Sequence, residues 1–271
     1  MTKADENIRQ WLVQLAPISL NEMSGIKLMN RTDTKFVTSK RKLVELLELA
    51  HGQYYVQQID DKRIAAYRTT YWDTPTHRFY LEHHNTHAPR QKIRVRTYVD
   101  SDLTFLEVKT KNNHGRTKKK RITVPSQERQ DVIDAGGTPF IQGLTGATFD
   151  DIIPTVQNQF QRITLVNYGK TERLTIDFNV QFHNFETDCD AGTGDLVIIE
   201  LKRDGNVFSP ILEMLRQVRI KPHGFSKYCI GSAMTNGSLK NNAFKFKMVT
   251  ISKLVGNPFC VPPRPLSSYE S

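Results

Sequence analysis

The sequence has few cysteines and no long apolar run, and both features narrow the class of protein. Its three cysteines, Cys189, Cys229 and Cys260, show no C-x-x-C spacing among 271 residues. Such a sparse and odd set is typical of reduced thiols in the cytoplasm rather than of a disulfide-bonded scaffold. No apolar run approaches the ~18 residues that a membrane span needs, and the N-terminus lacks the basic and apolar regions of a signal peptide. We therefore expect a cytoplasmic location and no membrane span in this chain.

Acidic residues are also in the minority. The chain has 38 Lys and Arg against 28 Asp and Glu, with a net charge of +10 and a pI near 9.5. Hydrophobic residues make up 38% and aromatic residues 9% of the chain. This is enough for a folded core, so the charge is not that of a disordered basic tail. The excess of positive charge predicts an anionic partner: a nucleic acid, an anionic membrane or a phosphate-rich small molecule.

Three consecutive segments between residues 91 and 124 alternate between charged and apolar side chains. Successive side chains of a strand point to opposite faces, so each segment reads as a strand with one charged and one apolar face. The charged faces carry Lys92, Arg94 and Arg96, then Glu107, Lys109 and Lys111, then Lys119 and Arg121. Similar rows recur later in the chain and contain Arg162, Arg173, Asp177, Glu200 and Lys202.

Two explanations fit these mostly cationic rows. A solvated antiparallel sheet normally carries charge on its outer face. However, like charges on neighbouring strands destabilise a sheet, and rows of one predominant sign recur far apart in this chain. We infer that the rows converge on a polyanion.

Periodicity and turn residues predict about eight strands and several amphipathic helices. Besides the three central strands, strands are expected at residues 31–38, 54–59, 64–72, 159–167, 171–180 and 195–203. Helices are expected at residues 7–15, 40–50, 74–87, 126–136, 210–218, 226–235 and 238–255, with Ser39 and Ser226 as N-caps. Residues 183–194 are expected to form a polar loop, and the tail from residue 258 is expected to be loose.

These elements predict an α+β fold. Amphipathic helices need an apolar surface, and each strand offers one apolar face. The expected architecture is an eight-stranded antiparallel β-barrel that forms a tunnel, with charged rows inside and helices packed outside. The chain would divide into an N-terminal helical segment (1–23), the tunnel domain (24–236) and a C-terminal helix with a loose tail (237–271).

Two segments suggest metal sites, but neither has a complete motif. His83 and His87 have i, i+4 spacing, yet no Glu follows the first His as in H-E-x-x-H. Asp188, Asp190 and Asp195 lie in one polar segment that lacks the Gly and the distal Glu of an EF-hand. Exposed polar side chains explain both segments more simply.

Taken in order, the charged motifs resemble the catalytic domain of vacuolar transporter chaperone (VTC) proteins, a branch of the triphosphate tunnel metalloenzymes. The motifs are Arg31-x-Asp-x-Lys35, Arg94-x-Arg96, Leu106-Glu-Val-Lys109, Lys118-Lys-Lys-Arg121, Arg162, Arg173-x-Thr-x-Asp177, Glu200-x-Lys202 and Ser226-Lys-Tyr228. The family fold is an eight-stranded antiparallel tunnel with helices outside. The Glu-x-Glu-x-Lys start of the wider superfamily is replaced here by Arg31-x-Asp-x-Lys35, which implies a tunnel poorer in acids and favours a polymerase or a binder over a two-metal triphosphatase.

The resemblance also implies roles for individual residues. The phosphate chain at the catalytic centre would be bound by Lys35, Arg94, Arg96, Lys109, Arg162 and Arg173. Further substrate contacts would come from Lys119, Arg121, Lys202, Ser226 and Lys227. A divalent metal, Mn²⁺ or Mg²⁺, would be held by Glu200, with Glu107 as the second candidate.

The implied activity is a metal-dependent polyphosphate polymerase that transfers the γ-phosphate of ATP to a growing polyphosphate chain. The implied partners are ATP, pyrophosphate and polyphosphate. An inorganic triphosphatase and a non-catalytic polyphosphate-binding module stay open, as does a membrane partner, because fungal VTC chains carry membrane helices. A nucleic-acid-binding protein is less favoured, because single-strand binders place aromatic residues among basic ones. Here the aromatic residues mostly share the parity of the apolar residues.

Overall fold

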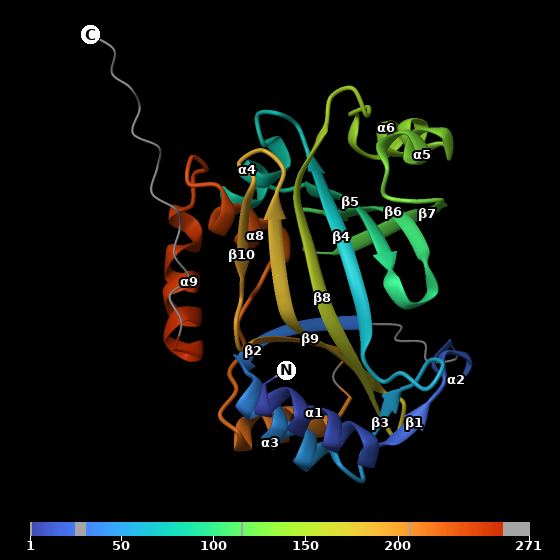
Figure 1. Ribbon diagram of the computed structural model, residues 1–271, viewed down its shortest axis with the longest axis vertical. Coiled ribbons are helices and arrows are strands. Elements are labelled where there is room, and N and C mark those ends of the chain that lie inside the picture. Colours follow the sequence, from blue (N-terminus) through green and yellow to red (C-terminus); the bar gives the residue numbers. More distant parts are fainter. Residues whose placement is uncertain (1, 25–30, 115, 206, 257–271) are drawn as a thin grey trace.

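The computed structural model describes residues 2–24, 31–114, 116–205 and 207–256. Eight antiparallel strands form one continuous path in the order β2-β11-β9-β8-β4-β5-β6-β7 (Figure 1). Their bounds are β2 (Arg31–Ser39), β11 (Leu196–Asp204), β9 (Glu172–Asn184), β8 (Ile153–Asn167), β4 (Ala65–Asp73), β5 (Arg90–Tyr98), β6 (Leu103–Lys111) and β7 (Thr117–Val124). Three short strands extend the sheet, namely β1 (Ala16–Ile18), β3 (Tyr54–Gln57) and β10 (Cys189–Gly192).

The two ends of this path, β2 and β7, face a common cavity. Side chains of β2 and β11 line it together with side chains of β5, β6 and β7, so the sheet curves round on itself. The predicted α+β fold, an eight-stranded antiparallel tunnel with helices outside, is therefore confirmed. One feature differs from a closed barrel: among the residues described, β7 pairs only with β6 and leaves an open edge. Lys118, Lys119 and Lys120 are exposed on this edge strand, and lysines are common on strands that must not pair further.

Three helices cover one apolar end of the sheet. They are α1 (Lys3–Gln14), α3 (Lys40–Ala50) and α7 (Pro210–Gln217), at the bottom of Figure 1. The fully buried Ile163, Ile176 and Ile199 lie in the same hydrophobic cluster as the leucines of α3. The predicted N-cap is confirmed, because the Ser39 side chain accepts a hydrogen bond from the Lys42 amide. Helix α1 begins earlier than predicted because Thr2 forms a capping box.

The remaining helices cover the other apolar faces. They are α2 (Leu20–Ser24), α4 (Arg78–His84), α5 (Arg129–Asp134), α6 (Gly137–Thr145), α8 (Lys227–Thr235) and α9 (Asn242–Val255), with a short 3₁₀ turn at Val99–Ser101. The helix predicted at 126–136 corresponds to α5, which is shorter, and a separate helix, α6, begins directly after Gly136. Gly136, with φ of +85°, separates them in a left-handed conformation that favours glycine. No helix within the described ranges is long and apolar enough to cross a membrane.

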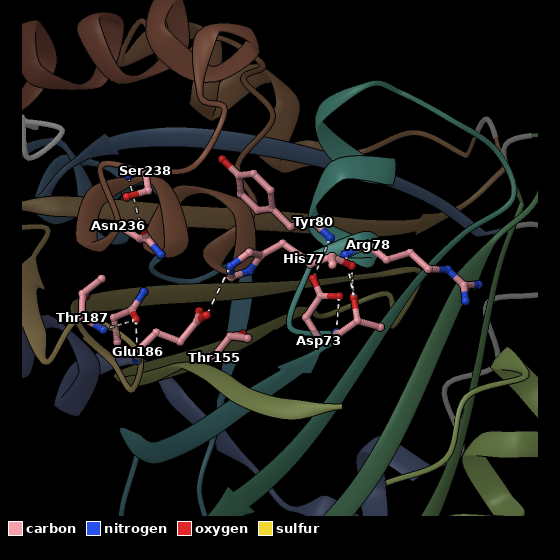
Figure 2. Close-up of polar contacts among 12 residues, drawn as sticks. Asp73, His77, Arg78, Tyr80, Thr155, Glu186, Thr187, Asn236 and Ser238 are labelled. Carbon is pink, nitrogen blue, oxygen red and sulfur yellow. Dashed lines mark hydrogen bonds and ion pairs between the residues drawn. The ribbon is translucent and has the colours of Figure 1, made fainter. Parts of the chain in front are cut away.

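Helix α4 begins later than predicted, because a buried carboxylate upstream caps it. Asp73 is fully buried at the end of β4 and accepts hydrogen bonds from the Phe79 amide (2.9 Å) and the Tyr80 amide (2.8 Å). It also accepts one from the Tyr228 hydroxyl on α8. Figure 2 shows Asp73 beside the first turn of α4, with His77 directed away from it toward Glu186. Asp73 thus fixes α4 and α8 to the sheet side by side.

The prediction of a polar loop at residues 183–194 is wrong. Strand β9 continues to Asn184, and β10 returns antiparallel to it, with Cys189 opposite Asn184 and Gly192 opposite Gln181. The turn is closed by Asn184, whose side-chain oxygen accepts hydrogen bonds from the Glu186 and Thr187 amides. The polar composition reflects an exposed hairpin rather than an irregular loop.

Candidate functional site

A cavity of about 420 Å³ lies inside the curved sheet and is covered by α4, α8 and α9. Basic side chains dominate its wall among the described residues: they are Lys35, Arg90, Lys92, Lys109, Lys111 and Lys247. Of the carboxylates in the described part of the chain, those of Asp33 and Glu200 line it. His83, His84, Phe225, Ser226, Cys229 and Phe244 supply most of the remaining wall.

Several of these lysines have no full counter-charge. The Lys35 amine donates to the Phe225 carbonyl (2.9 Å) and is 3.9 Å from Glu200. The Lys92 amine donates to the Ser226 hydroxyl (2.9 Å). In the described chain no carboxylate lies within 4.0 Å of the Lys92 or Lys109 amine. Neighbouring positive charges repel one another and destabilise the folded protein unless an anion occupies the cavity.

The excess of positive charge on the cavity wall lowers the pKa values of two of its lysines. Burial, followed by repulsion from Lys35, Arg94 and Arg90, lowers the pKa of Lys92 to about 8, although the nearby Cys229 opposes the shift. Burial and the charge of Lys35 likewise lower the pKa of Lys109 to about 8. Both lysines therefore lose part of their charge near neutral pH when no anion is present.

Glu200 is the acidic group best placed on this wall. Its backbone lies opposite Lys35 across the β2–β11 register, and its carboxylate is 3.2 Å from the Lys202 amine. Burial alone would raise the pKa of Glu200, but Lys202, Lys35 and Lys109 together lower it to about 2. The carboxylate is therefore ionised and partly accessible from the cavity.

A second set of predicted cations is neutralised by two buried acids. The fully buried Glu107 accepts from the Arg94 guanidinium (2.7 Å) and the Lys119 amine (2.8 Å). Asp177 accepts a bidentate contact from Arg162 and a further contact from Lys227. These groups form a charge-paired layer beside the cavity, unlike Lys92 and Lys109 of its wall, which have no carboxylate within 4.0 Å in the described chain.

Aromatic rings lie among the buried cations, which corrects the expectation that they would sit on the apolar faces. The guanidinium carbons of Arg96 and Arg162 lie 5.6 and 4.8 Å from the centre of the Tyr67 ring. The Lys227 amine lies 4.2 Å from the centre of the Phe160 ring. Tyr67 and Phe160 stack on each other and are almost fully buried. Because these rings are covered, they stabilise cations within the protein and offer no surface for stacking nucleobases.

The remaining predicted residues lie at different distances from the cavity. Lys202 contacts Glu200, and Arg173 lies opposite Lys202 across the β9–β11 register. Arg121 is exposed and lies over Phe105. Ser226 caps α8 as predicted and lines the cavity, whereas Lys227 contacts Asp177 in the paired layer. The predicted pair Ser226 and Lys227 therefore separates between the two layers.

Motif-based reasoning missed several residues of the wall. Lys92 and Lys111 share the parity of the predicted rows, and that parity is the signal that could have selected them. Arg90 extends the same row at the start of β5, whereas His83 and Lys247 enter the wall from two helices, where no strand periodicity identifies them.

The histidine and aspartate metal motifs receive no support. Within the described residues no group of three His, Cys, Asp or Glu side chains is placed to hold a metal ion. Burial and the charges of Lys92 and Arg90 lower the pKa of His83 to about 2, while His87 is exposed. Asp190 pairs with His183 at 3.0 Å.

Binding of a polyanion at pH 8 is expected to draw protons from solution. With a pKa of about 8, Lys92 of the free protein is roughly half protonated at that pH. A phosphate group beside the amine would restore its charge, with an uptake of roughly half a proton from this lysine. Calorimetric titration of tripolyphosphate in two buffers of different ionisation enthalpy measures the uptake. Lys92→Met should remove the part of the proton uptake that comes from Lys92. A proton uptake equal to that of the wild type would contradict a contact between Lys92 and the bound anion.

The lowered pKa of Lys92 also affects how the stability of the free protein depends on pH, and this dependence is opposite in sign to that of anion affinity. An unfolded lysine titrates near a pKa of about 10.4. Between pH 8 and that value the folded chain binds fewer protons at Lys92 than the unfolded chain does. The contribution of Lys92 to stability therefore rises with pH across this window, whereas anion affinity falls.

Fold and site together define a protein whose curved antiparallel sheet encloses a cationic cavity. The sequence model of the VTC domain family matches residues 30–236, which is well over half of the chain. The chain therefore belongs to the VTC domain family, and the resemblance carried by the charged motifs is confirmed. Membership supports a function that involves triphosphate or polyphosphate.

Solved structures with a similar fold are distant in sequence. A Bacillus halodurans protein provisionally named adenylate cyclase is 13% identical with a TM-score of 0.48, covering 73% of this chain and 96% of that one. The Hippeastrum protein HpAC1, for which a dominant triphosphatase activity is described, is 13% identical with a TM-score of 0.48, covering 74% and 94%. A Vibrio parahaemolyticus protein with the same provisional name is 8% identical with a TM-score of 0.44, covering 74% and 97%. No curated protein sequence matches the chain.

Proposed function

We propose that this chain is a metal-dependent polyphosphate polymerase that transfers the γ-phosphate of ATP to a growing polyphosphate chain. One observation carries the proposal. Lysines that lack full counter-charge converge on one cavity, and the ionised carboxylate of Glu200 lies among them. Membership of the VTC domain family supports the same substrate class.

The transfer itself asks for positioning and charge neutralisation rather than covalent catalysis. A terminal oxygen of the polyphosphate chain attacks the γ-phosphorus of ATP. The bond from that phosphorus to the bridging oxygen breaks, and ADP leaves with the electron pair. The attacking oxygen is already an anion, so the site needs no general base. Lys35, Lys92 and Lys109 would neutralise the phosphate oxygens and hold the two substrates in line.

The donor set of the wall fits a divalent metal that is held mainly by its substrate. A hard cation such as Mn²⁺ or Mg²⁺ takes one or two carboxylates and completes its shell with phosphate oxygens and water. Glu200 offers an ionised carboxylate on the cavity wall, and Asp33 lines the same cavity. Glu107 is a poorer candidate, because Arg94 and Lys119 already occupy its two oxygens. The metal would supply further neutralisation of phosphate charge.

The activity is tested directly with purified protein. ATP and Mn²⁺ are incubated with and without a pyrophosphate primer, and the products are separated on a gel stained for polyphosphate. A ladder of long chains is the expected result. Phosphate release from tripolyphosphate without a ladder would indicate a triphosphatase. Neither product, with tripolyphosphate still raising the melting temperature, would indicate a binding module; both of these outcomes would overturn the polymerase.

Replacement of the proposed metal ligand should change the metal requirement. Glu200→Gln is expected to raise the Mn²⁺ concentration for half-maximal synthesis about tenfold, because a neutral amide is a weaker ligand for a hard cation. Glu213→Gln makes the same change on an exposed face of α7, where Glu213 pairs with Arg216, and should leave the metal requirement unchanged. Equal metal dependence in the two variants would exclude Glu200 as the ligand.

A further inference from the structure

The C-terminal helix α9 forms part of the cavity wall, although it lies beyond the family match, which ends at residue 236. Phe244, Met248 and Ile251 lie on one face of the helix and are buried in the cluster that contains Tyr80 and Tyr228. The Tyr80 hydroxyl donates to the Lys240 carbonyl (2.9 Å), and the Ala243 amide donates to His84 (3.3 Å). These contacts seat α9 beside α4 and α8, on the left in Figure 1.

One lysine of this helix faces the cavity. Lys247 lines it together with Lys35, Ser226 and Glu200. The Lys247 amine lies 3.9 Å from the position that a β-carbon on Gly224 would occupy, so it is next to the segment that leads into α8. Burial lowers the pKa of the neighbouring His223, and the charge of Lys247 adds to this shift. Within the described residues no carboxylate lies within 4.0 Å of the Lys247 amine.

The other lysines of α9 do not share this position. Lys245 and Lys253 are exposed and do not line the cavity. In an α-helix, residues 245 and 247 point to nearly opposite sides, since each residue advances about 100° around the axis. Lys247 therefore differs from Lys245 in direction while sharing its chemistry, its helix and its exposure to solvent.

We propose that Lys247 is a substrate-binding residue, which contacts a phosphate group of an inorganic or nucleoside polyphosphate at the helical mouth of the cavity. The inference deepens the proposed function and rests on the cavity being the polyphosphate site. It extends that site to a helix outside the matched family segment. An unpaired amine at the open side of a cationic cavity adds a charge-assisted contact without the cost of burying its own charge.

The test compares tripolyphosphate affinity by calorimetry at one fixed salt concentration. Lys247→Gln is expected to bind tripolyphosphate about 5- to 10-fold more weakly than the wild type, because it loses one charge-assisted contact. Lys245→Gln removes the same charge from the same helix and should stay within about twofold. Lys247→Arg keeps the charge and should bind nearly as well as the wild type.

The outcomes separate this inference from the polymerase proposal. Equal affinities of Lys247→Gln and Lys245→Gln would overturn the inference even if the wild type makes polyphosphate. A selective loss in Lys247→Gln would uphold it even if no polyphosphate forms. A wild-type protein that does not bind tripolyphosphate would overturn it together with the site.

Discussion

Replacement of Asp177 by alanine is expected to lower the free energy of unfolding by about 3–5 kcal/mol. The Asp177 carboxylate is almost fully buried and is shared by two cations, Arg162 and Lys227. Burial alone would raise the pKa of Asp177, but these two cations hold it well below its usual range. Without the carboxylate, two buried positive charges would remain beside each other, with Arg96 close to them.

Thermal unfolding measures this effect, with a fall in melting temperature of roughly 6–15 °C. Asp190→Ala is the matched control, since Asp190 pairs with His183 on the exposed hairpin and its loss should cost little. Tripolyphosphate should raise the melting temperature of Asp177→Ala more than that of the wild type, if the anion reaches the two orphaned cations. A melting temperature equal to that of the control would show that the buried acid does not hold this layer together.

The inward-facing rows could be predicted because a strand has a simple period. Side chains alternate strictly between two faces, so this alternation places Lys109 and Glu200 in charged rows of two separate segments, and the family resemblance adds Lys35. The structure places all three on the same cavity wall. The helices were also accessible to prediction where a cap is local in sequence, as at Ser39 and Ser226.

The pairing of charges inside the fold could not be predicted in the same way. Whether a lysine is neutralised depends on which residues stand opposite it, and this register is set by tertiary pairing. Arg94 lies opposite Glu107, whereas Lys92 lies opposite Lys109. Two cations of one row, two residues apart, therefore differ in their charge environment: Arg94 pairs with Glu107, whereas the Lys92 amine donates to the Ser226 hydroxyl.

The position of α9 in the cavity wall could not be predicted from the sequence, for a different reason. Phe244 and Met248 are buried, but Phe246 and Val249 on the same helix are exposed. A helix with apolar residues on both sides does not reveal which face packs on the protein. The direction of Lys247 follows only from that choice, so its place in the cavity wall became visible in the structure alone.

Replacement of Lys109 by methionine is expected to stabilise the free protein and to weaken anion binding, and this combination of signs distinguishes a binding lysine from a structural one. Lys109 has no carboxylate partner within 4.0 Å in the described chain. Burial and the repulsion of Lys35 lower its pKa to about 8. Methionine retains most of the volume of the side chain without the charge, so the unliganded sheet loses a repulsive group.

The affinity for tripolyphosphate should fall about 15- to 100-fold, because a partly buried, charge-assisted phosphate contact is lost. The melting temperature without ligand should rise by a few degrees. Lys120→Met makes the same substitution on β7, where the side chain is exposed and points away from the cavity, and should change neither quantity appreciably. A variant that loses stability and keeps its affinity would show that Lys109 supports the fold, and the phosphate site would then have to be sought elsewhere on the sheet.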